Sequence, residues 1–422
     1  MDILIKKAQI VDPHASLNGK QMDILISKGK IAQIGHNLQA DKARVILAEG
    51  LHVSPGWLDL GVQTGDPGLE HRENLQTVTR AAAAGGFTAI ACFPNTFPVT
   101  DSKSGIYYLQ QNSRDLMVDC LPLGAVSDGC EGKDISELID MYKAGAYAFT
   151  DGNKPIQHAG LMLRALMYVR AFDGLVINHP HDNTLAGNGQ MHEGIISTSL
   201  GLRGIPSIAE EIMVQRDIEL AAYSDSKVHI SNISTADSVK KIKKAKADGL
   251  KITASVAAIN LLLDDSALFE FDSNLKVLPP LRSSADLSAL KKGLKEGTID
   301  MITSNHVPLE EEVKKLEFPY AKFGAIGLET AFSVAWSALK GKFTLDELIQ
   351  KLSIAPRKLL NLPAIKIEVG ETANLSLFLP DVEWEVAEKD IFSRSGNTPF
   401  VGKKLQGRVL GIINGQKVEI GA

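Results

Sequence analysis

Residues 52–93 read HVSPGWLDLGVQTGDPGLEHRENLQTVTRAAAAGGFTAIACF, and they carry the clearest signal of fold class. An apolar run of strand length, 52–62, precedes a helical pattern over 73–86, and a second apolar run follows over 87–93. Continuously apolar strands are typical of a parallel sheet, because such a sheet is buried on both faces. The stretch therefore predicts a strand-helix-strand unit.

The same alternation continues along the middle of the chain. Six further apolar runs of strand length alternate with helical patterns: VDCLPLGAV, AYAFTD, LVINH, KVHISNIS, KITASV and TIDMITSN. Eight strands, each followed by a helix, predict a (β/α)8 TIM-type barrel over residues 53–364. A doubly wound open sheet is the alternative fold. That fold typically carries a GxGxxG phosphate-binding turn after its first strand, and GVQTGDPG does not fit that pattern.

Both ends of the chain differ from the middle. Residues 1–52 and 365–422 contain short alternating runs punctuated by Gly, Asn and Asp, which indicate β-strands. Because the termini of a domain often lie close together, we expect one small β-sandwich domain assembled from 1–52 and 365–422. The expected fold is α/β, a barrel with an accessory β domain.

Composition excludes several classes of protein. The chain has 422 residues, 44% hydrophobic and 23% charged, with a net charge of −5 and a mean hydropathy of +0.00. No basic excess points to nucleic acid, and no apolar surplus points to a membrane. Three cysteines without CxxC spacing indicate buried thiols in a reducing compartment, and no secretory signal is apparent at the N-terminus. We expect a cytoplasmic protein.

The carboxyl ends of barrel strands carry the chemistry in this fold, and here they are polar but mostly neutral. The residues at these ends include Gln63, Asn95, Asp151, His179, Asn232, Asn305 and His306. A hydrolytic metal site needs histidine or carboxylate ligands, which lower the pKa of a bound water. The rim offers only Asp151, His179 and either His181 or His306 for that purpose.

The chain resembles the dihydroorotases of the amidohydrolase superfamily over nearly its whole length. The resemblance rests on the segments PGWLDL, DPGLEHRENLQTVTRAAAAGGFTAI, FPNT, AGAYAFTD, HEGIISTSLGLRGIPSIAEE, VHISNISTADS, FGAIGLETA and SRSGNTPF. It implies a metal-binding barrel with a small β domain, the interconversion of carbamoyl aspartate and dihydroorotate in pyrimidine synthesis, and assembly into a homo-oligomer.

The departures from the family pattern concern its chemistry. Gly61 and Gln63 replace the His-x-His metal pair after the first strand, and Gly65 replaces the arginine that holds the substrate carboxylate. Asn232 replaces the histidine ligand of strand six, and Asn305 replaces the aspartate that serves as general base. His179, Asn95 and Asp151 survive; Asp151 fills one of two neighbouring aspartate slots, and Gly152 lies in the next.

Three functional hypotheses follow. The leading one is a non-catalytic dihydroorotase homologue, with no catalytic residue, metal or cofactor, that acts as a structural or regulatory partner of aspartate transcarbamoylase. Its vestigial substrate pocket would contain Gln63, Asn95, Asn232 and Asn305. The second is an active dihydroorotase, or another cyclic-amide hydrolase, with zinc in a rearranged site of Asp151, His179, His181 and His306. The third is a sensor whose neutral pocket binds a pyrimidine-like molecule, since amides suit neutral hydrogen-bonding ligands.

Overall fold

The computed structural model describes residues 2–421 and contains a parallel barrel sheet of eight strands. Its strands, from one edge to the other, are β15 (Met301–Thr303), β14 (Ile252–Ala257), β13 (Lys227–Ile230), β10 (Leu175–Asn178), β9 (Ala148–Phe149), β8 (Asp119–Gly124), β7 (Phe87–Cys92) and β6 (Trp57–Val62). The last and first strands meet where the Ser304 amide donates to Asp59 Oδ1 at 2.9 Å. The predicted barrel is confirmed.

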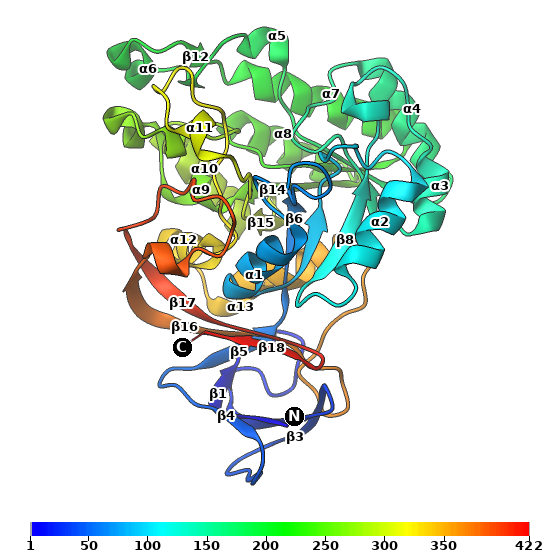
Figure 1. Ribbon diagram of the computed structural model, residues 1–422. Coiled ribbons are helices and arrows are strands. Elements are labelled where there is room, and N and C mark those ends of the chain that lie inside the picture. Colours follow the sequence, from blue (N-terminus) through cyan, green and yellow to red (C-terminus); the bar gives the residue numbers. More distant parts are fainter. Residues whose placement is uncertain (1, 422) are drawn as a thin grey trace.

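Helices surround this sheet (Figure 1). The longer ones are α1 (Leu75–Ala84), α2 (Lys103–Ser113), α3 (Leu138–Ala144), α4 (Ala159–Arg170), α7 (Ile208–Ser224), α8 (Ala236–Ala247), α10 (Ser284–Lys295) and α12 (Ala331–Leu339). Helix α1 begins where the Asn74 side chain accepts from the Thr77 amide at 3.0 Å, a capping contact that satisfies a free helical donor. Its buried face, which includes Leu75, Val78 and Ala82, packs toward the strands.

Shorter helices and strands lie in the segments that connect or follow the barrel strands. They are α5 (Asn183–Ala186), β11 (Met191–His192), α6 (Ile195–Leu200), β12 (Gly204–Ile205), α9 (Ala258–Leu262), α11 (Glu311–Lys314), α13 (Leu345–Ile349) and α14 (Ala355–Leu359). Among residues 2–421, no helix is both long enough and apolar enough to cross a bilayer. Cys92, Cys120 and Cys130 are free and buried, as the sequence predicts.

The two ends of the chain join in one mostly antiparallel sheet below the barrel in Figure 1. From the N-terminal part come β1 (Ile3–Ile10), β2 (Gln21–Ser27), β3 (Lys30–Gly35), β4 (Arg44–Ile46) and β5 (His52–Pro55). The C-terminal part supplies β16 (Asn374–Glu385), β17 (Lys404–Asn414) and β18 (Lys417–Ile420). Strand β5 lies between β1 and β16, so residues more than 300 positions apart are hydrogen-bonded neighbours.

The run 52–62 forms two strands in different sheets, rather than the single barrel strand expected from its continuous apolarity. Strand β5 pairs with β16 in the terminal sheet, and β6 pairs with β7 in the barrel. Gly56 separates them: a Cβ there would lie 1.9 Å from Asn374 Oδ1 and 2.2 Å from Thr88 Oγ1. Only glycine lets the backbone pass between the two sheets this closely.

Candidate functional site at the barrel mouth

Asn232 and Asn305 meet at the carboxyl ends of β13 and β15. Asn232 Nδ2 donates to Asn305 Oδ1 at 3.3 Å, and the Thr303 hydroxyl donates to Asn232 Oδ1 at 2.7 Å. Asn305 Nδ2 donates to the Leu278 carbonyl at 3.1 Å. Both asparagines have positive φ, +54° and +52°, which asparagine tolerates better than most residues. The side-chain amides of both asparagines are thus engaged in hydrogen bonds within the protein.

A small pocket of about 80 Å³ opens beside this pair. Its wall contains His179, Asn232 and Asn305, together with Phe93, Gly152, Asn153, Ser231, Leu278, Val307, Phe323 and Gly324. This volume is far below the roughly 300–1,000 Å³ of an ordinary ligand pocket. This pocket has room for a few water molecules, while a neighbouring cavity of about 400 Å³ runs along Asp151 and His181.

Asn95 and Gln63 lie outside the wall of this pocket. Asn95 Nδ2 donates to the Asp151 carbonyl at 3.0 Å, and its Oδ1 accepts from the Asn153 amide at 3.1 Å. The Gln63 amide donates to the His306 carbonyl at 3.3 Å, and its side-chain Nε2 is buried without a partner. Of the four residues expected in a vestigial pocket, only Asn232 and Asn305 lie together in its wall.

Asp151 is held by three donors of the neighbouring loop. Its Oδ1 accepts from the Val126 and Ser127 amides at 2.9 Å each, and its Oδ2 accepts from the Ser127 hydroxyl at 2.5 Å. Burial raises the pKa of the carboxyl, while the Ser127 and Val126 hydrogen bonds lower it. The Asp151 carboxylate therefore fixes the loop after β8. The sequence analysis did not identify this structural role.

His179, the histidine that the family resemblance retains, lies in the pocket with its Nε2 buried and unpartnered. Burial lowers its pKa to about 4, so the ring is neutral near pH 7. His181 stacks on it with ring centroids 6.0 Å apart, and burial also lowers the His181 pKa to about 4. Two neutral imidazoles lie side by side.

His306 is engaged elsewhere. Its Nδ1 accepts from the Gly327 and Leu328 amides at 3.2 and 3.4 Å, and its Nε2 faces Glu73 Oε2 at 3.5 Å. Glu73 also accepts from the Ser393 hydroxyl, so this cluster ties the barrel to the C-terminal segment. His306 therefore serves a structural contact, and the structure does not place it with His179 in the pocket wall.

Three glycines stand where the family resemblance places ligands or a substrate-binding arginine, and the space for their side chains is filled. A Cβ on Gly61 would lie 2.4 Å from Phe93 Cζ. At Gly152 it would lie 1.7 Å from Asn95 Oδ1, and at Gly65 it would lie 2.3 Å from the Glu73 carbonyl oxygen. Nothing in the sequence pattern indicated these three contacts.

The donor set at the mouth does not fit a catalytic zinc ion. Such an ion takes three protein ligands, most often histidine or carboxylate. Within residues 2–421, no group of three or more His, Cys, Asp or Glu side chains is placed to hold a metal. His179 has a free nitrogen, whereas Asp151 and His306 are already bonded.

Comparisons with known proteins give the relatives of the chain. The family model described as dihydro-orotase-like matches residues 50–238. The protein named dihydroorotase of Pelotomaculum thermopropionicum is 42% identical over 99% of this chain and 98% of its own length. Its counterpart of the same name from Syntrophus aciditrophicus is 40% identical over 97% of each chain.

Solved structures share the fold at lower identity. L-hydantoinase (dihydropyrimidinase) from Arthrobacter aurescens superposes with a TM-score of 0.86 and 24% identity, covering 100% of this chain and 97% of that one. D-hydantoinase from a Thermus species gives a TM-score of 0.82 at 22% identity, covering 99% and 95%. These likenesses establish a common architecture of barrel and terminal sheet.

Proposed function

The chain belongs to the dihydroorotase family, and we propose that it is a member that does not catalyse ring hydrolysis at its barrel mouth. In this proposal it acts as a structural or regulatory partner of aspartate transcarbamoylase. The observation that carries the proposal is the ring of Phe93, which occupies the place of a side chain at position 61. A metal ligand cannot be accommodated there without moving that ring.

The energetics of the remaining residues support the same proposal. Asn305 cannot accept a proton near neutral pH, and loss of a general base typically lowers a rate by about 10²- to 10⁴-fold. Without metal, no Lewis acid polarises the scissile amide and no low-pKa water forms. Gly65 offers no guanidinium for the substrate carboxylate, so a charge-assisted bidentate contact is missing.

The test is a paired measurement of metal content and turnover. The protein is purified without chelator and its zinc is quantified by mass spectrometry, while dihydroorotate formation and hydrolysis are assayed with and without added zinc. We expect substoichiometric zinc and no turnover above the buffer rate. Stoichiometric zinc together with turnover would overturn the proposal.

The partner is tested separately by affinity purification of the tagged chain from its native host. We expect aspartate transcarbamoylase to co-purify and the two proteins to elute together in size-exclusion chromatography. Purified aspartate transcarbamoylase that neither binds this chain nor changes its own stability or kinetics would contradict the partnership.

An active dihydroorotase is the second candidate, and the names of the relatives favour it. Proteins named dihydroorotase are 39–42% identical over nearly the whole chain. Activity would need zinc in a rearranged site of Asp151, His179, His181 and His306, with Asp151 released from Ser127. The paired measurement decides between the candidates: zinc-dependent turnover that Asp151→Asn and His179→Gln each abolish would establish the second.

A sensor of pyrimidine-like molecules is the remaining possibility. The pocket of about 80 Å³ beside Asn232 and Asn305 counts against it, because ligand pockets usually measure roughly 300–1,000 Å³. Thermal unfolding with dihydroorotate, orotate and uracil tests it, and we expect no shift of the melting temperature that depends on Asn232.

A further inference from the structure

A larger cavity, of about 550 Å³, lies at the opposite end of the barrel. Its walls come from the amino-terminal parts of β7 and β8, from α14, and from the segments 362–366 and 371–374 that lead into the terminal sheet. This volume lies within the range of pockets that hold small organic molecules, roughly 300–1,000 Å³. The cavity is therefore large enough for a metabolite.

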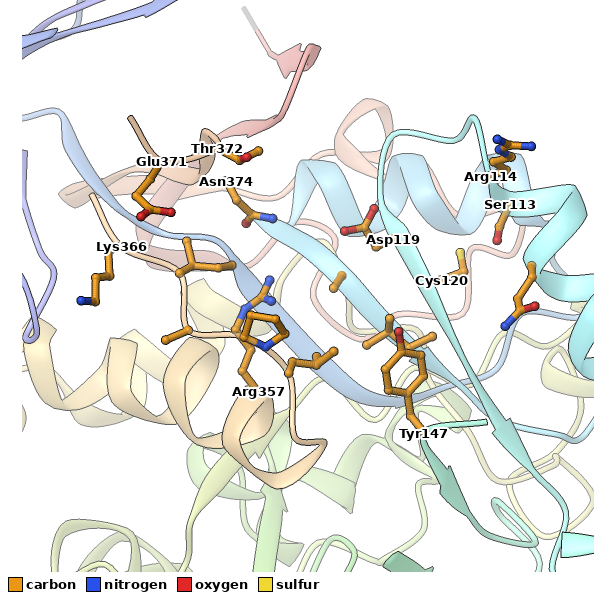
Figure 2. A pocket seen from close by; sticks show the side chains of 17 residues that line it. Ser113, Arg114, Asp119, Cys120, Tyr147, Arg357, Lys366, Glu371, Thr372 and Asn374 are labelled. Atoms are coloured by element: carbon orange, nitrogen blue, oxygen red, sulfur yellow. The ribbon is translucent and has the colours of Figure 1, made fainter. Parts of the chain in front are cut away.

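Arg357 is the buried charge of this cavity. The residue is only 9% exposed, and Figure 2 shows the guanidinium projecting among the lining residues. The Nε atom has no hydrogen-bond partner, and Nη2 makes a single long contact of 3.5 Å to the Thr88 hydroxyl. A buried guanidinium has five donors, so most of its hydrogen-bonding capacity is unused in the described chain.

The carboxylates near Arg357 do not neutralise it. Asp119 acts on the guanidinium through space, but its Oδ1 accepts from Asn414 Nδ2 at 3.2 Å and its side chain is exposed to solvent. Burial lowers the Arg357 pKa to about 10, which still leaves the group charged near pH 7. Leaving a buried charge unpaired is strongly destabilising, so the site favours an added anion.

The remaining lining residues suit an anionic ligand with an apolar body. Arg114 and Lys366 are exposed cations on the wall, so three cations face two carboxylates, Asp119 and Glu371. Leu121, Leu362 and Pro363 give an apolar surface. A planar guanidinium binds carboxylate and phosphate groups through two parallel hydrogen bonds.

We propose that this cavity binds a small organic molecule through a carboxylate or phosphate group seated on the Arg357 guanidinium. The oxyanion accepts hydrogen bonds from Nε and a terminal nitrogen of Arg357, and the apolar wall contacts the rest of the ligand. The site is independent of the barrel mouth and of any reaction there.

Isothermal titration at constant ionic strength tests the proposal, with inorganic phosphate in one arm, succinate in the second and chloride as the reference anion. We expect saturable binding of phosphate or succinate, and not of chloride. Binding in the phosphate arm alone identifies a phosphorylated ligand, and binding in the succinate arm alone identifies a carboxylate. Absence of saturable binding in both arms overturns the proposal.

Three variants assign the binding to Arg357. Arg357→Met removes the guanidinium at similar length, and we expect affinity to fall by about 10- to 100-fold. Arg357→Lys keeps the charge but loses the paired donors, so we expect an intermediate affinity, which tests the assignment independently of the Met variant. Arg164→Gln, at an exposed arginine outside the cavity, is the matched control and should change affinity little. Equal affinities in wild type and both Arg357 variants would overturn the assignment.

Discussion

The centre of the barrel mouth and the amino end of the barrel differ in how much space they leave for a ligand. At the carboxyl end, where TIM-barrel enzymes carry their chemistry, the pocket beside Asn232 and Asn305 measures about 80 Å³, and both asparagines are bonded within the protein. A second cavity at this end, of about 400 Å³, runs along Asp151 and His181. At the amino end, the cavity measures about 550 Å³ and contains a buried arginine without an ion-pair partner in the described chain. The surroundings of the asparagine pair resemble packed core, whereas the cavity around Arg357 resembles a binding site.

The largest expected effect comes from disturbing the closed mouth. Gly61→Ala forces a side chain into φ +100° and against the Phe93 ring, so we expect a loss of about 2–5 kcal/mol in the free energy of unfolding. Gly132→Ala is the matched control, because Gly132 has φ +69° but no atom within 4 Å of its Cβ position. Urea denaturation measures both, and equal losses would show that Phe93 does not close the mouth.

At the cavity around Arg357, we expect a substitution to increase the free energy of unfolding rather than decrease it. Arg357→Met removes an unpaired buried charge, so without ligand we expect the variant to be more stable than wild type by about 1–3 kcal/mol. Arg114→Met, at an exposed position of the same cavity, should stay within about 0.5 kcal/mol. Thermal and urea unfolding in chloride buffer measure the difference. A destabilised Arg357→Met would mean that the guanidinium already has partners.

His179 makes the stability of the mouth depend on pH. Burial lowers its pKa from the ordinary 6.5 to about 4, so the unfolded chain takes up a proton at higher pH than the folded protein. Stability is therefore full above about pH 6.5 and falls as the pH decreases toward 4, by up to about 1.4 kcal/mol per pH unit. His179→Gln should reduce the proton uptake on unfolding in this window by one group. An unchanged slope would contradict the neutral, buried state.

The smallest effect is expected at the asparagine pair. Asn305→Asp replaces the donor to the Leu278 carbonyl with an acceptor, so we expect a loss of about 1 kcal/mol at pH 7. Asn37→Asp is the control, since Asn37 also has positive φ but is exposed. Restoring this carboxylate should not produce dihydroorotase turnover, because the space at Gly61 remains filled. Turnover in Asn305→Asp would show that the mouth is accessible to substrate.

The sequence predicted local patterns well and long-range packing poorly. Continuous apolar runs identified the barrel strands, because burial on both faces leaves a direct mark on composition. The contact of Phe93 with Gly61 joins two residues 32 positions apart, and no periodicity reports it. Arg357 sits in the run APRKLL, which reads as an ordinary charged helix, and only the fold shows that this arginine is buried.

The position of β5 has a consequence for synthesis of the chain. Strand β5 ends at Pro55, and its neighbour β16 begins at Asn374, so the N-terminal half of the terminal sheet emerges from the ribosome long before its partner. At roughly 5–20 residues per second, the intervening segment takes on the order of 15–60 s to translate. During that time the edge of β5 has no β16 to pair with, and unpaired edges invite association with other chains. Nascent chains of this protein should therefore depend most on chaperones before residue 374 has been made.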